Sequence, residues 1–176
     1  MEKWKTCAVF SALCLITGTA QAMSHEMKAR ADILDAKGKS IGTATLTEQK
    51  DGVKVMLKVS GLAPGQHGFH IHEKGTCTPP DFKSAGGHFN PSKKHHGSDN
   101  PEGKHVGDFP NLEVKEDGTA QATVVATGAT LKKGAASLLK SGGTAIVIHA
   151  NPDDYKSDPA GNAGDRIACG VIVKGK

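Results

Sequence analysis

Hydrophobic and polar residues alternate with a period of two along most of the chain after Met27, and turn residues separate the short runs in which they do so. In Val53–Val59, for example, every second residue is valine or leucine, and the residues between are two lysines and Met56. No stretch keeps the period of an amphipathic helix for long, so the pattern predicts an all-β chain. Eight strands are expected, at Met27–Leu34, Ile41–Glu48, Val53–Val59, His67–Glu73, Asn111–Lys115, Thr119–Val125, Thr144–His149 and Ile167–Val173.

Two long segments without this alternation, Lys74–Pro110 and Ala150–Asp165, interrupt the strands. Loops of such length in a compact domain are usually functional or disordered, and the first one contains most of the histidines. We therefore expect both loops to be ordered by what they bind. The segment Leu131–Lys140 could form a short helical turn, although Gly134 weakens that prediction.

Length and composition exclude several classes of function. The chain has 176 residues and a net charge of +4, which suits one domain. Its aromatic residues are Trp4, Tyr155 and five phenylalanines, too few for a stacking surface that binds single-stranded nucleic acid. No run of five like charges forms a polybasic arm for DNA or a membrane. What remains is a mild attraction for small anions.

The N-terminal segment is typical of a secretory signal peptide. Lys3 and Lys5 precede an apolar run that starts at Cys7, and Ala20-Gln21-Ala22 provides small residues for cleavage. The apolar run is too short for a helix of ~20 residues that spans a bilayer, so we expect no stable membrane anchor. We predict a signal peptide over residues 1–22 and a mature domain over residues 23–176. The alternative is an uncleaved anchor helix.

Removal of residues 1–22 would leave the mature chain with two cysteines, Cys77 and Cys169. An exported protein meets an oxidising compartment, where two cysteines favour a disulfide bond. The bond would close 92 residues of chain, which the loop-entropy model values at roughly 4–5 kcal/mol. The alternative is a pair of free, buried thiols.

Seven of the nine histidines lie between positions 67 and 105, which suggests a metal site. His70 and His72 are two apart in a predicted strand, so their side chains point to the same face, with Cα atoms about 6–7 Å apart. Phe69 and Ile71 would then face the core. Taken alone, the two histidines could equally be a solvated pair on an exposed face.

A second cluster follows in the first long loop. It contains His88, His95, His96, His105 and Asp108. Three imidazoles and one carboxylate suit a closed, tetrahedral zinc site that has a structural role. The alternative is a histidine-rich loop that binds metals loosely.

Four separated motifs occur along the predicted mature chain, at Gly65–His72, Gly86–Pro91, His105–Asp108 and Gly161–Val171. They resemble the signatures of one family, the copper,zinc superoxide dismutases, and the resemblance covers nearly the whole predicted mature chain. The resemblance implies an eight-stranded Greek-key β-barrel, flattened like a sandwich, an architecture for which this family is a known example. It also implies an enzyme that converts superoxide to oxygen and hydrogen peroxide.

The resemblance implies one copper and one zinc per chain. Four imidazoles suit tetragonal Cu(II), whereas nothing is placed for a blue-copper site. His96 fits the family's spacing better than His95, which leaves His95 as a solvated side chain. Copper would be bound by His70, His72, His88 and His149, and zinc by His88, His96, His105 and Asp108, so that His88 would bridge the two metals.

Two more residues match functional positions of the family. Asp153 resembles a carboxylate that joins a copper ligand to a zinc ligand, here His70 and His96, and fixes their tautomers. A surface aspartate is the alternative. Arg166 matches an arginine beside the copper channel, where its charge would hold superoxide, and an ordinary ion pair is the alternative. Arg166 and His88 are thus the expected catalytic residues.

The chain departs from the family's usual pattern after His149, where only 16 residues precede Arg166. The steering charges of animal enzymes have no clear counterparts there, and Lys156 is the first candidate after Arg166. Neither a monomer nor a homodimer is favoured. Together with the signal peptide, the resemblance predicts a bacterial periplasmic enzyme, with secretion as the second choice.

Two other functions fit part of the pattern. A store of copper or zinc would need the same ligands but no arginine channel. A redox-inactive relative of the family would typically lack one or more copper ligands, and the complete ligand set disfavours it.

Overall fold

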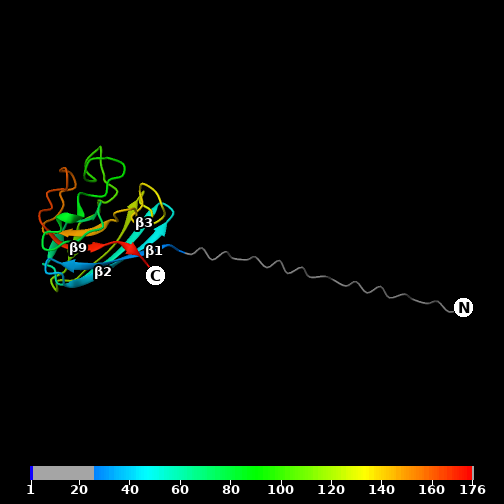
Figure 1. Ribbon diagram of the computed structural model, residues 1–176, viewed down its shortest axis with the longest axis horizontal. Coiled ribbons are helices and arrows are strands. Elements are labelled where there is room, and N and C mark those ends of the chain that lie inside the picture. Colours follow the sequence, from blue (N-terminus) through cyan, green and yellow to red (C-terminus); the bar gives the residue numbers. More distant parts are fainter. Residues whose placement is uncertain (2–25, 176) are drawn as a thin grey trace.

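Strands make up nearly all the regular structure in the computed structural model, which describes Met1 and residues 26–175 (Figure 1). The all-β prediction is therefore confirmed. The predicted signal peptide, residues 1–22, lies almost entirely outside the described residues. The strands are β1 (Lys28–Asp35), β2 (Ser40–Gln49), β3 (Gly52–Val59), β4 (Gly65–His67), β5 (Phe69–His72), β6 (Leu112–Val114), β7 (Ala120–Thr127), β8 (Ala145–His149), β9 (Arg166–Val171) and β10 (Val173–Lys174).

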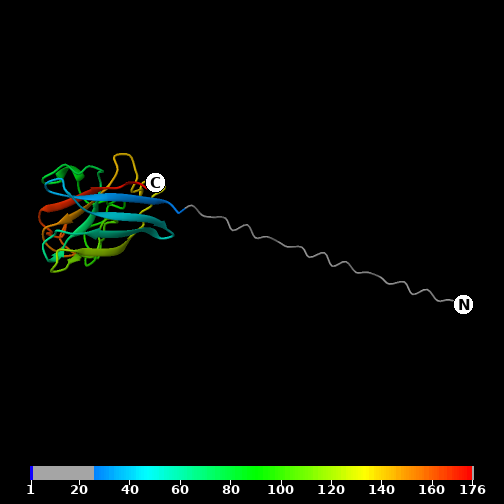
Figure 2. The same cartoon turned by 90° about the horizontal axis from the view of Figure 1, so that it is seen from below.

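The strands form a curled antiparallel sheet with the order β5-β8-β9-β1-β2-β3-β7, in which β10 also pairs with β1, and β4 pairs separately with β6. The chain therefore returns at its C-terminal end to lie beside its first strand. A tight turn, in which the Lys115 N–H donates to Thr119 O at 2.9 Å, links β6 to β7. Two views show the flattened barrel that results (Figures 1 and 2). This is the expected Greek-key fold.

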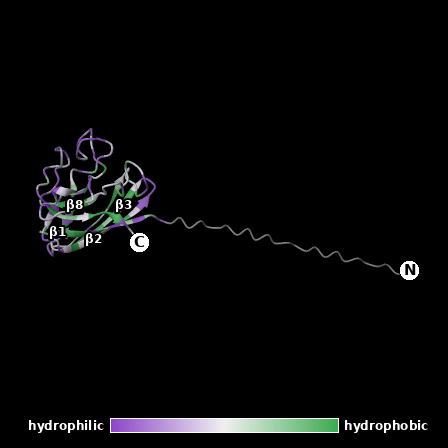
Figure 3. Cartoon of the chain, in the orientation of Figure 1, coloured by the Kyte–Doolittle hydropathy of each residue, from purple (hydrophilic) through white to green (hydrophobic). Residues whose placement is uncertain are grey.

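Alternation of side chains builds the core. Inward-facing residues such as Ile33, Leu46 and Leu57 are fully buried, whereas others of the same strands, such as Thr43 and Thr45, are exposed. Figure 3 shows the hydrophobic residues along the strands and the polar residues in the loops. The two long loops are joined to one another, because Asp158 accepts hydrogen bonds from His95 and His96.

The structure divides the predicted strand His67–Glu73 into β4 and β5 at Gly68. The Gly68 N–H donates to Asn151 O and its carbonyl accepts from the His149 N–H, both at 2.8 Å. A Cβ atom on Gly68 would lie 2.7 Å from Ala163 Cβ. The close approach therefore requires glycine where the chain changes partner from β6 to β8. The predicted strand Ile167–Val173 is likewise divided, into β9 and β10.

The prediction of a helical turn within Leu131–Lys140 is wrong. The segment forms turns, and its Leu138 N–H donates to Thr130 O at 2.8 Å. Leu131 and Leu138 are buried in the core, so they anchor this loop without a helix. In the described part of the chain, the helical structure is one 3₁₀ turn, Lys83–Ala85.

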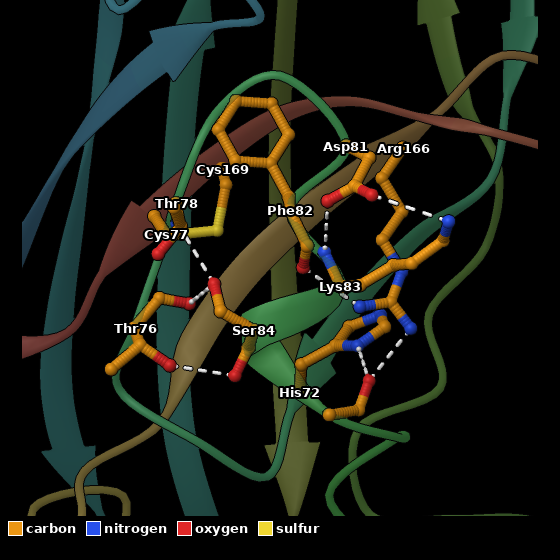
Figure 4. The surroundings of a disulfide bond; sticks show 11 residues. His72, Thr76, Cys77, Thr78, Asp81, Phe82, Lys83, Ser84, Arg166 and Cys169 are labelled. Carbon is orange, nitrogen blue, oxygen red and sulfur yellow. Dashed lines mark hydrogen bonds and ion pairs between the residues drawn. A yellow bond between two sulfur atoms is a disulfide. The ribbon is translucent and has the colours of Figure 1, made fainter.

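A disulfide bond joins Cys77 to Cys169, as predicted, with their Cα atoms 5.6 Å apart. It ties the first long loop to β9 (Figure 4). Around Cys169, a small cluster of buried residues includes Phe82, Ala85 and Val147. The loop residues between Cys77 and His88 are thus fixed to the barrel both by a covalent bond and by apolar packing.

Across residues 26–175, no helix has the length and apolar character that a membrane span needs.

Candidate metal centre

Strand β5 directs two histidines away from the core. Phe69 and Ile71 are fully buried among apolar side chains, and the alternate residues His70 and His72 are 0% and 1% exposed. The adjacent strand β8 ends at His149, whose ring centroid lies 5.0 Å from that of His70. Antiparallel pairing of β5 with β8 thus brings together histidines that are far apart in the sequence.

These three residues and His88 form the four-histidine group, in which one nitrogen of each ring lies within 4.8 Å of the others. Those nitrogens, Nδ1 of His70 and Nε2 of the other three, are buried and make no hydrogen bond within the described chain. Buried polar atoms normally have partners, so four convergent orphan nitrogens fit the donor set of a metal ion.

The opposite ring nitrogens of this group have oxygen partners. His70 Nε2 lies 2.6 Å from Asp153 Oδ2, His72 Nδ1 lies 2.9 Å from Gly86 O, and His149 Nδ1 lies 3.2 Å from Gly164 O. Each of these nitrogens donates its proton to the oxygen. The tautomer is thereby fixed, and an unprotonated nitrogen faces the group.

A second set, the His₃Asp group, consists of His88, His96, His105 and Asp108, whose ligand atoms also lie within 4.8 Å of one another. Asp108 Oδ1 lies 2.8 Å from His88 Nδ1 and 3.2 Å from His105 Nδ1. Asp108 Oδ2 accepts from the N–H groups of Gly97 and His105, each at 3.0 Å. Three nitrogens and one oxygen form a donor set that suits zinc.

His88 belongs to both groups. Its Nε2 faces the four-histidine group without a partner, and its Nδ1 faces Asp108. Its ring centroid lies 4.0 Å from that of His70 and 5.1 Å from that of His96. A single imidazole therefore separates the two sets of ligands and presents one nitrogen to each.

Asp153 connects the two groups on their outer side. Its side chain is 1% exposed, and its two oxygens accept from His70 Nε2 at 2.6 Å and His96 Nε2 at 3.0 Å. The alternative of a surface aspartate is therefore wrong. The sequence analysis missed Asn111, whose side-chain amide binds the main-chain N–H and C=O of Asp153 at 2.8 and 3.0 Å. The only sign of its role in the sequence was its position three residues after Asp108.

Burial keeps the four-histidine group neutral. Burial lowers the pKa of His149 and of His88 to about 4, even though hydrogen bonds to Gly164 O and to Asp108 oppose it. Burial also holds the pKa of His70 below, and that of His72 well below, the ordinary histidine value. At neutral pH these rings therefore keep the lone pairs that a metal needs.

The His₃Asp group has a different electrostatic balance. Burial lowers the pKa of His96, but Asp108 and Asp153 outweigh burial and raise it to about 9. For both carboxyl groups, burial opposes ionisation, but hydrogen bonds from histidines hold the pKa well below the usual range. The site thus contains two buried carboxylates whose charge a cation would balance.

The half-buried Arg166 lies at the start of β9, where its guanidinium donates to Phe82 O at 2.8 Å and to Gly86 O at 2.7 Å (Figure 4). No carboxylate within residues 26–175 lies at ion-pair distance from it, so the alternative of an ordinary ion pair is not supported. Its positive charge contributes, after burial, to the lowered pKa of His72 and His149. Arg166 therefore lies close to the four-histidine group.

Lys83 is a second positive charge beside Arg166 that was not predicted from the sequence. An open hollow beside Arg166 is lined by Pro80, Asp81, Lys83, Gly164 and Asp165, and Lys156 does not line it. Lys83 Nζ lies 3.2 Å from Asp81 Oδ2, so its charge is partly balanced. The sequence did contain a sign of this position. Lys83 is six residues after Cys77 and Arg166 is three residues before Cys169, so a bond between the two cysteines brings Lys83 and Arg166 to the same region.

The structure separates the adjacent residues His95 and His96. His96 is 0% exposed and belongs to the His₃Asp group, whereas His95 is exposed. His95 does have a partner, because its Nδ1 lies 2.5 Å from Asp158 Oδ2. His67 is buried outside both groups, with its Nδ1 2.8 Å from His149 O.

Comparisons with known proteins show which chains this one resembles. The family model for copper/zinc superoxide dismutase (SODC) matches residues 40–172. Superoxide dismutase (Cu-Zn) 1 of Aquifex aeolicus (strain VF5) is 53% identical over 173 residues, which cover 97% of this chain and 98% of that protein. Superoxide dismutase (Cu-Zn) of Caulobacter vibrioides is 47% identical over 138 residues, 77% of this chain and 79% of that protein.

Solved structures show the same fold. A SOD-like protein from Bacillus subtilis superimposes with a TM-score of 0.79 at 41% identity, covering 82% of this chain and 97% of that one. Cu/Zn superoxide dismutase from Brucella abortus gives a TM-score of 0.64 at 33% identity, covering 83% and 99%. The chain therefore belongs to the copper/zinc superoxide dismutase family, oxidoreductases whose cofactors are copper and zinc.

Proposed function

We propose that the chain converts superoxide to oxygen and hydrogen peroxide at a copper–zinc pair bridged by His88. Copper would be held by the four-histidine group and zinc by the His₃Asp group, one of each per chain. The observation that carries the proposal is the position of His88, whose two ring nitrogens face two different sets of donors.

Bound copper would supply one-electron chemistry, by which one superoxide is oxidised and a second, taking up two protons, is reduced. The residues of the chain would prepare and complete that exchange. Arg166 would attract the anion and hold it beside the four-histidine group. His88 Nε2 faces that group and can carry one of the two protons. Asp153 would hold His70 and His96 in the tautomers that leave their inner nitrogens free.

We also propose that the enzyme is exported to the periplasm, with secretion as the second choice, and protects against superoxide outside the cytoplasm. The support is the signal-peptide pattern of residues 1–22 and the disulfide bond, which needs an oxidising compartment to persist. Cell fractionation and the mass of the mature chain test this. A protein that keeps residues 1–22 in the cytoplasm would refute it.

The central experiment measures metal content and superoxide consumption in the same purified sample. We expect about one copper and one zinc per chain and rapid consumption of superoxide, because two ligand sets share one histidine. Zinc without copper after copper loading would contradict the catalytic role. Both metals without superoxide consumption would favour metal storage.

A further inference from the structure

Asp158 is an exposed residue of the second long loop that contacts two successive residues of the first loop. Its Oδ1 accepts from the main-chain N–H of His96 at 2.7 Å, and its Oδ2 accepts from Nδ1–H of the His95 ring at 2.5 Å. One carboxylate therefore holds the buried histidine by its backbone and its exposed neighbour by its side chain.

The two histidines have the same chemistry and are adjacent, so side-chain type alone does not decide which of them enters the His₃Asp group. Turning the chain to exchange them would break both contacts with Asp158. Gly97, which follows at φ +93°, restricts the turn less than another residue would. Its own N–H donates to Asp108 Oδ2, which helps to hold the observed arrangement.

We propose that Asp158 is a positioning residue that selects His96 over His95 for the zinc side of the metal centre. The carboxylate keeps the His95 ring at the surface and fixes the backbone from which the His96 ring reaches inward. Asp158 makes no hydrogen bond to the buried ligand atoms, so it acts on the site only through His95 and the backbone of His96. The inference rests on the proposed assignment of zinc to the His₃Asp group.

The test measures zinc affinity of the metal-depleted protein by competition with a chromophoric chelator. Loss of a residue that orients a metal ligand typically costs 10–100-fold in affinity. We therefore expect Asp158→Ala to weaken zinc binding by about tenfold or more. Cobalt(II) in place of zinc gives a visible spectrum of the same site, and we expect Asp158→Ala to shift it. When His95→Ala is added to Asp158→Ala, the spectrum should become uniform, because His96 is then the only one of the two histidines that can bind the cobalt.

Asp158→Asn provides the rescue. Its amide oxygen can accept from the His96 N–H, and its NH₂ can donate to Nδ1 of the other His95 tautomer. We expect its zinc affinity to stay within about threefold of the wild type, because both contacts persist.

Asp154→Ala is the matched control, because Asp154 is exposed in the same loop and accepts from the N–H groups of Lys156 and Ser157 without contacting a ligand. Its zinc affinity should remain near that of the wild type. Equal weakening by Asp154→Ala and Asp158→Ala would show general loosening and overturn the inference. Unchanged affinity and cobalt spectrum in Asp158→Ala would also overturn it. If the wild-type chain itself bound no zinc, the proposed function would fail instead.

Discussion

Arg166 and His72 donate to the same main-chain oxygen, that of Gly86, at 2.7 and 2.9 Å. The guanidinium is therefore held at a fixed position relative to a histidine of the four-histidine group. A second carbonyl, Phe82 O, accepts from the other terminal nitrogen of the guanidinium. Because both acceptors are neutral, the positive charge of Arg166 is not cancelled by a direct carboxylate partner and can act on an anion.

Replacement of Arg166 should slow capture of superoxide. Superoxide dismutases are known examples of enzymes near the diffusional limit of ~10⁸–10⁹ M⁻¹s⁻¹ and of electrostatic steering. We expect Arg166→Gln to lower the second-order rate roughly tenfold, and Arg166→Glu to lower it further because it repels the anion. Pulse radiolysis on samples of equal copper content measures both rates.

Salt provides the control for that experiment. The Debye length is ~10 Å at 0.1 M salt, so rising ionic strength should slow the wild type more than either variant. Lys83→Gln should have a smaller effect, since Asp81 already balances part of that charge. Full activity in Arg166→Glu would mean that the arginine only connects β9 to the first long loop and does not attract superoxide.

Two histidine variants should separate the two metals. His72 belongs to one ligand group and His88 to both. We expect His72→Ala to abolish superoxide consumption and copper retention while about one zinc per chain remains, and His88→Ala to weaken both sites. Elemental analysis after dialysis against a weak chelator gives the counts. Equal loss of both metals in His72→Ala would contradict the division.

Loss of the disulfide bond should weaken both the fold and the site. Cys169→Ser removes a closure of 92 residues, so the free energy of unfolding should fall by up to about 4 kcal/mol. The segment that contains Phe82 O and Gly86 O should loosen as well, and activity should fall even below the unfolding temperature. Denaturant titration checks the first effect and hydrogen exchange the second. Unchanged exchange in residues 78–87 would show that apolar packing alone holds the loop.

The stability of the metal-free protein should be greatest near pH 6.5 as far as the site histidines are concerned. His88 and His149 stay neutral in the folded state down to about pH 4. Between pH 6.5 and 4 the unfolded chain binds protons that the folded chain does not bind, so the free energy of unfolding falls as pH falls. His96 has the opposite sign, because its folded pKa is raised to about 9. Its contribution is complete below pH 6.5 and is lost as pH rises to 9.

Melting temperatures of chelator-treated protein from pH 4 to 9 test both slopes. His149→Gln should flatten the acid side, and His96→Gln should flatten the alkaline side. If His96→Gln kept the alkaline slope of the wild type, some group other than His96 would be responsible for it.

Much of the fold was predictable because alternation along β1, β2 and β3 reflects one buried and one solvated face. The break at Gly68 was not, because it depends on a backbone contact with Asn151, which is distant in the sequence. The turns within Leu131–Lys140 were not predictable for a related reason, because burial of Leu131 and Leu138 in the core holds this loop without a helix.

The residues of the four-histidine and His₃Asp groups were identifiable from their type and order, and the resemblance assigned them to two metals. The supporting residues were harder to predict. Asn111, Lys83 and Asp158 are ordinary polar residues in the sequence, and only folding brings them to Asp153, Arg166 and His96.

The two ligand groups also differ in the length of chain that each one spans. His88 and Asp108 are 20 residues apart, so the His₃Asp group is contained in one loop. The four-histidine group needs β5 to pair with β8, where Phe69 lies opposite Ile148. Pairing of distant segments costs loop-closure entropy before its contacts form, and such contacts arise late and slowly. During folding, the residues of the His₃Asp group therefore start close together in the chain, although His96 takes its final position only when Asp153 and Asp158 of the second long loop reach it. The four-histidine group exists only after the barrel has closed.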